Sequence, residues 1–203
     1  MLKRIRIVLW VACAIPLAAV VAVVGILAYT RPADTGQLLL QASGIGGPFK
    51  LASSAGGELS TADLKGKPFI VFFGYTHCPD ICPTTISDVT SWLEALGPEG
   101  KEIKALFVSV DPERDSPASL KDYLSSFPDQ VVGLTGTPDE IAEVAKEFRV
   151  YYAKHPLKDG DYSMDHSALI YLMDREGKLA GTLTYDAKAE DAIAKLKRLL
   201  ATA

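Results

Sequence analysis

Residues 68–83 decide the fold, and they read Pro68-Phe-Ile-Val-Phe-Phe-Gly-Tyr-Thr-His-Cys-Pro-Asp-Ile-Cys-Pro83. The first part is an uninterrupted apolar run of strand length, which is typical of a strand buried on both faces. Gly74 ends the run, and a loop with two cysteines follows. Over residues 84–96 apolar side chains recur at helical spacing. The segment therefore predicts a buried strand, a cysteine-bearing loop and a helix, with Pro83 as the first helical residue.

The rest of the chain places further strands and helices around this unit. They are a hairpin of 48–51 with 58–59, a strand at 103–110, a helix from the Ser116-Pro117 cap to about 127, a strand at 131–134, a helix from Thr137, strands at 168–173 and 179–184, and a helix at 186–200. A βαβ half followed by a ββα half is the thioredoxin layout. We therefore predict an α/β thioredoxin-like sandwich, with a central mixed sheet, helices on both faces and an N-terminal hairpin.

The N-terminal segment predicts a single transmembrane helix. Residues 7–29 contain no charge, and a helix of this length spans roughly 34 Å, enough to cross a bilayer. Lys3, Arg4 and Arg6 precede the run, so the positive-inside rule leaves the N-terminus in the cytoplasm. A cleaved signal peptide is the alternative, but its apolar region is normally shorter and ends in a small-residue cleavage site. We expect an uncleaved anchor in the bacterial inner membrane and a periplasmic domain.

Charge is unevenly distributed along the chain. All 25 acidic residues lie from Asp34 onward, together with 17 of the 21 basic residues, so this part has a net charge of −8. The excess argues against nucleic acid as a partner and suits a domain that meets cations or basic protein surfaces. We expect three parts, which are a cytoplasmic tip and membrane anchor at 1–30, a linker at 31–46, and a thioredoxin-like domain at 47–203.

The cysteines and one histidine predict a metal site in that domain. Cys78 and Cys82 are its only cysteines, since Cys13 lies in the apolar run. They precede a helix, whose N-terminus favours the thiolate that coordinates a metal or attacks a disulfide. His166 comes just before a later strand, and in a thioredoxin-like fold that loop abuts the cysteine loop. A site of two cysteines and one histidine fits Cu(I) well, and imidazole also supports Cu(II).

Other interpretations of the same residues remain open. A CxxxC pair alone is commonly a structural disulfide, and a histidine before a strand is commonly a polar loop residue. Zinc is the competing metal, but it usually takes a fourth ligand, and none is obvious. The sequence indicates weaker candidates for the metal site as well. His77 is a candidate further ligand, Asp80 and Asp165 are candidate carboxylates beside the site, and Met164 is a thioether donor or a core residue. His155 is expected to lie in a solvated loop. Residues 111–115 look like a carboxylate cluster, which turn and capping chemistry explains.

Six stretches, in order, carry a family resemblance. They are Gly46-Gly-Pro-Phe49, Gly66-Lys-Pro68, Phe73-Gly-Tyr-Thr-His-Cys-Pro-Asp-Ile-Cys-Pro83, Val108-Ser-Val-Asp-Pro-Glu-Arg-Asp115, Gly133-Leu-Thr-Gly136 and Asp165-His-Ser167. Through them the chain resembles the Sco/SenC family, thioredoxin-like proteins linked to copper delivery for cytochrome c oxidase assembly. The resemblance implies that Cys78, Cys82 and His166 are the copper ligands. It also implies delivery of copper, or of reducing equivalents, to the binuclear copper centre of oxidase subunit II.

The leading functional hypothesis is therefore a copper metallochaperone rather than an enzyme. Another copper chaperone or a thioredoxin-like reductant is a possible further partner. The alternatives are a thiol-disulfide reductase, for which Cys78 and Cys82 would be the redox pair, and a redox or copper sensor. Thioredoxin-type reductases normally carry CxxC and a proline entering the later strand. This chain has CxxxC and no proline after residue 158, which weakens the reductase interpretation.

Overall fold

The computed structural model describes residues 44–158 and 160–201. The expected anchor at 1–30 and most of the expected linker lie outside these residues, so both stay predictions. Within the described part of the chain, no helix combines the length and apolar character needed to span a bilayer.

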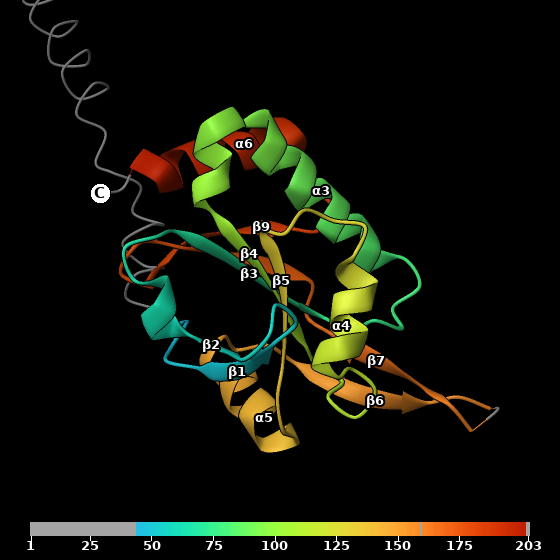
Figure 1. Cartoon of the computed structure of the whole chain (residues 1–203). Coiled ribbons are helices and arrows are strands. Elements are labelled where there is room, and N and C mark those ends of the chain that lie inside the picture. Colours follow the sequence, from blue (N-terminus) through green and yellow to red (C-terminus); the bar gives the residue numbers. More distant parts are fainter. Residues whose placement is uncertain (1–43, 159, 202–203) are drawn as a thin grey trace, which may run out of the picture. The chain divides into compact units, whose positions relative to one another are not determined.

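A seven-stranded mixed sheet forms the centre of the domain, in the order β2-β1-β5-β4-β3-β8-β9 (Figure 1). Strand β3 runs parallel to β4, and β4 to β5, whereas β8 is antiparallel to β3. The strands are β1 (Lys50–Ser53), β2 (Glu58–Ser60), β3 (Phe69–Gly74), β4 (Lys104–Ser109), β5 (Val131–Thr135), β8 (Leu169–Met173) and β9 (Leu179–Thr184). The predicted thioredoxin-like sandwich is thereby confirmed for the described residues.

Helices cover both faces of the sheet and bury it in two layers. The helices are α3 (Ile81–Ala95), α4 (Pro117–Leu124), α5 (Pro138–Glu147) and α6 (Ala189–Ala201), with short 3-10 turns η1 (Thr61–Leu64) and η2 (Gly97–Glu102). Buried side chains of α3, α4 and α6 join one core cluster, and those of α5 join the other. Figure 1 shows α5 on the opposite side of the sheet from α3 and α6.

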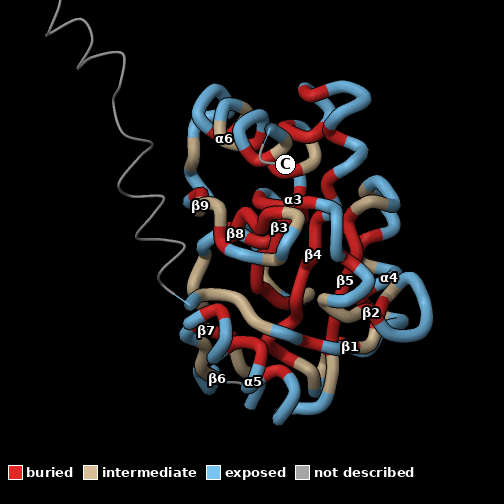
Figure 2. Tube along the Cα trace, turned by 90° about the vertical axis from the view of Figure 1, so that its left-hand side faces the viewer, coloured by how far each residue is buried: buried red, intermediate tan, exposed pale blue. Residues whose placement is uncertain are grey.

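Strand β3 is the middle of this arrangement because its side chains alternate between the two cores. Phe69, Val71 and Phe73 belong to the α5 side, whereas Ile70 and Phe72 belong to the α3 side. All six of its residues are buried, and Figure 2 shows the central strands as the continuous buried part of the trace. A strand buried on both faces needs an apolar residue at every position, which explains the apolar run at residues 68–73.

Two sequence predictions need correction. The segment that holds His155 is not a loop, because β6 (Tyr152–Pro156) and β7 (Tyr162–His166) form a separate antiparallel hairpin. Most of its residues are exposed or half-buried, so the apolar alternation that reveals strands is missing. Helix α3 begins at Ile81, which makes Pro83 its third residue rather than its first. Proline is accepted there because the first N–H groups of a helix have no partner inside it.

Candidate metal centre

The two cysteines lie where β3 passes into α3, at the carboxyl end of the central strand. Gly74 is the last residue of β3, and a Cβ atom at this position would lie 2.7 Å from the sulfur of Cys82 and 2.5 Å from the Phe107 ring. Side-chain atoms do not approach one another so closely. Only a glycine at position 74 therefore allows the backbone of β3 to lie this close to the sulfur of Cys82.

Cys82 and Cys78 differ in depth. Cys82 lies in the first turn of α3 and is 3% exposed, whereas Cys78 lies in the preceding loop and is half-buried. The backbone N–H of Cys82 donates to the sulfur of Cys78 over 3.4 Å. The positive end of the helix dipole also lies beside Cys78, and both effects favour a thiolate there.

His166 reaches the cysteines from the end of β7, 84 residues away in sequence from Cys82. Its Nε2 atom lies 3.6 Å from the Cys82 sulfur, and its Nδ1 atom lies 3.1 Å from the carbonyl oxygen of Ser167. A carbonyl only accepts hydrogen bonds, so Nδ1 carries the proton in this arrangement and Nε2 keeps its lone pair. The backbone thus fixes the tautomer that a metal would need.

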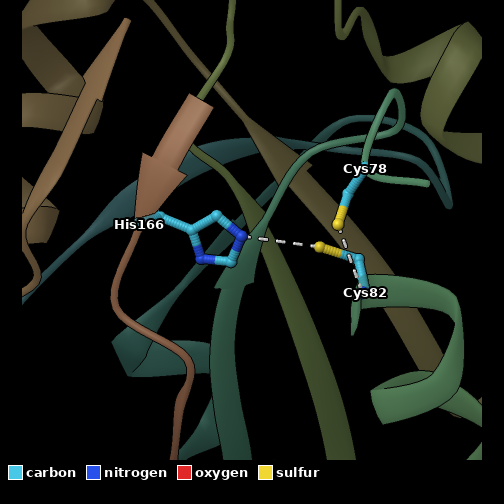
Figure 3. A group of neighbouring side chains, drawn as sticks. All are labelled: Cys78, Cys82 and His166. Carbon is cyan, nitrogen blue, oxygen red and sulfur yellow. Dashed lines mark hydrogen bonds between the residues drawn. The ribbon is translucent and has the colours of Figure 1, made fainter. Parts of the chain in front are cut away.

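The geometry of these three side chains suits one metal ion. The two sulfurs and one imidazole nitrogen all lie within 4.8 Å of one another, and Figure 3 shows them converging. Donor atoms bonded to a common ion at about 2.0–2.3 Å lie roughly 3.3–4 Å apart, so little movement is needed. Among the described residues this is the one such group of histidine, cysteine and carboxylate side chains, and it offers no fourth ligand for zinc.

Protonation of the pair is strongly asymmetric. Hydrogen bonding with the Cys82 side chain lowers the pKa of Cys78 to about 4. The same hydrogen bond and burial raise the pKa of Cys82 far above its ordinary value. Without a metal, the two sulfurs therefore carry one proton between them, and this proton is bound to the buried Cys82. A metal ion that displaces this proton would be held by two thiolates.

A buried carboxylate holds the cysteine loop in place, and sequence reasoning missed it. Asp115 is fully buried and accepts hydrogen bonds from the Thr76 backbone N–H at 3.0 Å, the Thr76 hydroxyl at 2.5 Å and the Ser109 hydroxyl at 2.6 Å. The explanation of residues 111–115 as a turn was incomplete, because it left out these contacts. A hydroxyl-bearing residue two positions before the first cysteine was the available signal.

The weaker candidates lie around the group rather than within it. The Nδ1 atom of His77 lies 3.0 Å from the Thr76 hydroxyl oxygen, and the His77 side chain is exposed. The Oδ2 atom of Asp165 lies 3.5 Å from the Nε2 atom of His155, and both side chains are exposed. Met164 is buried in the core on the α5 side of the sheet, which is the core-filling role expected for it.

The site opens onto a cavity of about 690 Å³. Its lining includes Cys78, His166, Asp80, Asp165 and Tyr151 but not Cys82. An ion bound to the three donors would therefore be reachable from one side.

Comparison with known proteins gives one consistent result. The family model SCO1/SenC matches residues 39–201. The mitochondrial SCO1 protein of Saccharomyces cerevisiae is 45% identical over 149 residues, which are 71% of this chain and 50% of that protein. The SCO2-like protein RC0895 of Rickettsia conorii is 40% identical and covers 66% of each chain. The chain thus spans about half the length of the yeast relative.

Solved structures agree. Bradyrhizobium japonicum ScoI with copper bound is 52% identical, with a TM-score of 0.71 over 76% of this chain and 99% of that one. Yeast Sco1 with copper bound is 40% identical, with a TM-score of 0.72 over 78% and 90%. BsSco, described as a member of the Sco family of cytochrome c oxidase assembly proteins with a disulfide switch, is 28% identical, with a TM-score of 0.63 over 78% and 95%.

Proposed function

The chain belongs to the SCO1/SenC family, and we propose from this membership that it binds one copper ion through Cys78, Cys82 and His166. The observation that carries the proposal is the convergence of two sulfurs and one imidazole nitrogen within 4.8 Å. Thiolates are soft donors that select Cu(I), and imidazole extends the site to Cu(II). Copper is the cargo here rather than a resident cofactor.

The protein would act as a metallochaperone for cytochrome c oxidase. Relatives with copper bound, and one described as an oxidase assembly protein, support this role. We infer that the acceptor is the binuclear copper centre of oxidase subunit II, and that another copper chaperone or a thioredoxin-like reductant prepares the site. The cavity beside Cys78 and His166 supports transfer, since an acceptor's donor atoms could reach the ion there.

The location that fits this role is the periplasmic side of a bacterial inner membrane. The charge-free run at 7–29 would anchor the chain with its N-terminus in the cytoplasm. An alkaline phosphatase fusion after Ala203 should then be active in a bacterial host. An inactive fusion, beside an active cytoplasmic reporter at the same position, would contradict the topology.

Copper titration tests the binding proposal. The reduced full-length protein in detergent should bind one Cu(I) per chain without oxygen, and the Cys78–Cys82 disulfide form should bind none. His166→Ala should weaken binding and remove the thiolate-to-Cu(II) charge-transfer band, because the imidazole completes the Cu(II) site. Tight Cu(I) binding by the oxidised protein would show that the ligands are assigned wrongly.

A second function, thiol-disulfide reduction, is favoured by one observation. The half-buried Cys78 has a pKa of about 4 and lies next to a buried, protonated Cys82, as expected of an attacking and a resolving thiol. His166 separates the two functions, since disulfide exchange does not require it. Normal oxidase assembly with His166→Ala, together with failed assembly with Cys78→Ser, would favour the reductase over the chaperone.

A further inference from the structure

The hairpin that carries His166 stands apart from the main sheet. In the described part of the chain, β6 and β7 pair only with each other. At its base the backbone N–H of Ser167 donates to the Tyr151 carbonyl over 2.9 Å, and the Tyr151 N–H donates to the Ser167 hydroxyl over 3.1 Å. Among the described residues, no strand of the seven-stranded sheet pairs with this hairpin, so side-chain contacts hold it against the body of the domain.

One face of β7 makes these contacts. Tyr162, Met164 and His166 alternate along the strand and therefore share a face. Met164 is buried in the core and His166 faces the cysteines, while Tyr162 is half-buried at the other end of the strand. The two ends are about 13 Å apart along an extended strand. A tilt of the strand at Tyr162 would consequently move His166.

Tyr162 is held by a polar cluster from the loop after β4. Its hydroxyl donates to Asp111 Oδ1 over 2.8 Å, and Arg114 Nη1 donates to the Tyr162 carbonyl over 3.0 Å. The guanidinium carbon of Arg114 lies 3.7 Å from the centre of the Tyr162 ring. Arg114 also donates through Nε to Asp111 and through Nη1 to Asp161, the latter over 3.1 Å. The Asp111 side chain is completely buried.

This cluster is better suited to fixing a position than to adding stability. A buried ion pair gains little net stability, because desolvation offsets its attraction. Charge-assisted hydrogen bonds are directional, however, and they tolerate few arrangements of the groups they join. Tyr75 connects the cluster with the metal donors, since its ring centre lies 5.9 Å from the Arg114 guanidinium and 5.9 Å from the centre of the His166 ring, which meets it edge-on.

We propose that Asp111, Arg114 and Tyr162 form a latch that holds β7 where His166 can reach an ion bound to the two cysteines. Tyr162 and Arg114 are then positioning residues, which act on the ion only through His166. This inference rests on the proposed copper binding.

A double-mutant cycle tests the latch. Tyr162→Phe removes one hydroxyl and keeps the ring, so the fold should survive. It should weaken copper binding about 10-fold and reduce the Cu(II) charge-transfer band, as changes beside a metal ligand commonly do. In a His166→Ala background the same substitution should have no further effect, because the donor it positions is gone. Equal losses in both backgrounds would overturn the proposal.

Tyr152→Phe is the matched control. Tyr152 lies directly opposite His166 in the hairpin ladder, and its hydroxyl donates to none of the described residues. Its removal should leave copper affinity unchanged. A loss as large as that of Tyr162→Phe would mean that any change in the hairpin disturbs the site, and the latch would have no special role.

A metal-free measurement separates the latch from the copper proposal. In the reduced apo protein, NMR should show a nuclear Overhauser effect between the rings of Tyr75 and His166. Arg114→Lys keeps a charge beside Asp111 but cannot reproduce the fork of hydrogen bonds, so this signal should weaken. An unchanged signal in both Arg114→Lys and Tyr162→Phe would refute the latch. Absence of copper binding by the unsubstituted protein, with the signal behaving as expected, would refute the proposed function alone.

Discussion

Replacing Gly74 by alanine would add one methyl group directly beneath the sulfur of Cys82. The new Cβ would meet that sulfur at 2.7 Å and the Phe107 ring at 2.5 Å, so a sulfur, a ring or the strand must move. Overpacking of this kind costs about 1–3 kcal/mol. Because the sulfur is one of the groups pushed, we also expect weaker copper binding.

Gly181→Ala provides the comparison. Gly181 also lies within a strand, β9, and the nearest atom to an added Cβ is Leu172 Cδ1 at 3.9 Å, an ordinary contact. Without a clash, the smaller entropy of the unfolded chain should raise stability by about 0.4–1 kcal/mol. The two variants should therefore differ by about 1.4–4 kcal/mol, or roughly 3–16 °C in unfolding temperature for a domain of this size.

Thermal unfolding of the reduced, metal-free proteins, followed by circular dichroism, measures the difference, and competition with a Cu(I) chelator measures the effect on the site. Equal unfolding temperatures and equal Cu(I) affinities for Gly74→Ala and Gly181→Ala would refute the reasoning. They would mean that the strand can shift away from the sulfur at no cost.

Four further outcomes are expected. Cys78 should be alkylated at pH 5–6, with a rate that falls as the pH drops through about 4, whereas Cys82 should stay unmodified; equal labelling of the two would contradict the asymmetry. Because the pKa of Cys78 is lower in the folded state, the folded, reduced protein binds fewer protons than the unfolded chain between pH 4 and 9. Urea titrations should therefore show a free energy of unfolding that rises with pH in this range. The contribution of Cys78 is lost as the pH falls through about 4. Asp115→Asn should lower the free energy of unfolding in urea by about 1–3 kcal/mol, because a single amide oxygen cannot accept all the hydrogen bonds from Thr76 and Ser109. An unchanged free energy would mean that water replaces these bonds. Thr137→Ala removes the side-chain cap of α5 and should cost about 1 kcal/mol while copper affinity stays the same, so a change in affinity would show that the two core layers are coupled.

The sequence predicted the parts of the fold whose cause is local. The apolar run at 68–73 requires burial on both faces, and the caps at Ser116 and Thr137 begin helices where expected. The approach of His166 to the cysteines was also predictable, since the thioredoxin layout itself brings the entry of β8 beside the exit of β3.

The missed features depend on partners far away in sequence. Asp111 and Asp115 are accommodated in the interior in part because Tyr162 and Thr76, 51 and 39 residues distant, donate to them. From the sequence alone both are indistinguishable from solvated turn residues. The β6–β7 hairpin was missed for a related reason. Its side chains are mostly exposed, so no apolar period identifies it, and its position depends on Arg114.

Because Cys82 is buried more deeply than Cys78, the proposed copper complex has one side that an acceptor can reach and one side that it cannot. Cys78 and His166 line the cavity, whereas Cys82 lies behind them in the first turn of α3. Donor atoms of an acceptor that enter from the cavity would meet the ion on the side of Cys78 and His166, so these two bonds can be exchanged while Cys82 still holds the ion. The order in which the bonds break, with the buried sulfur last, would keep copper bound to at least one protein at every stage of the transfer.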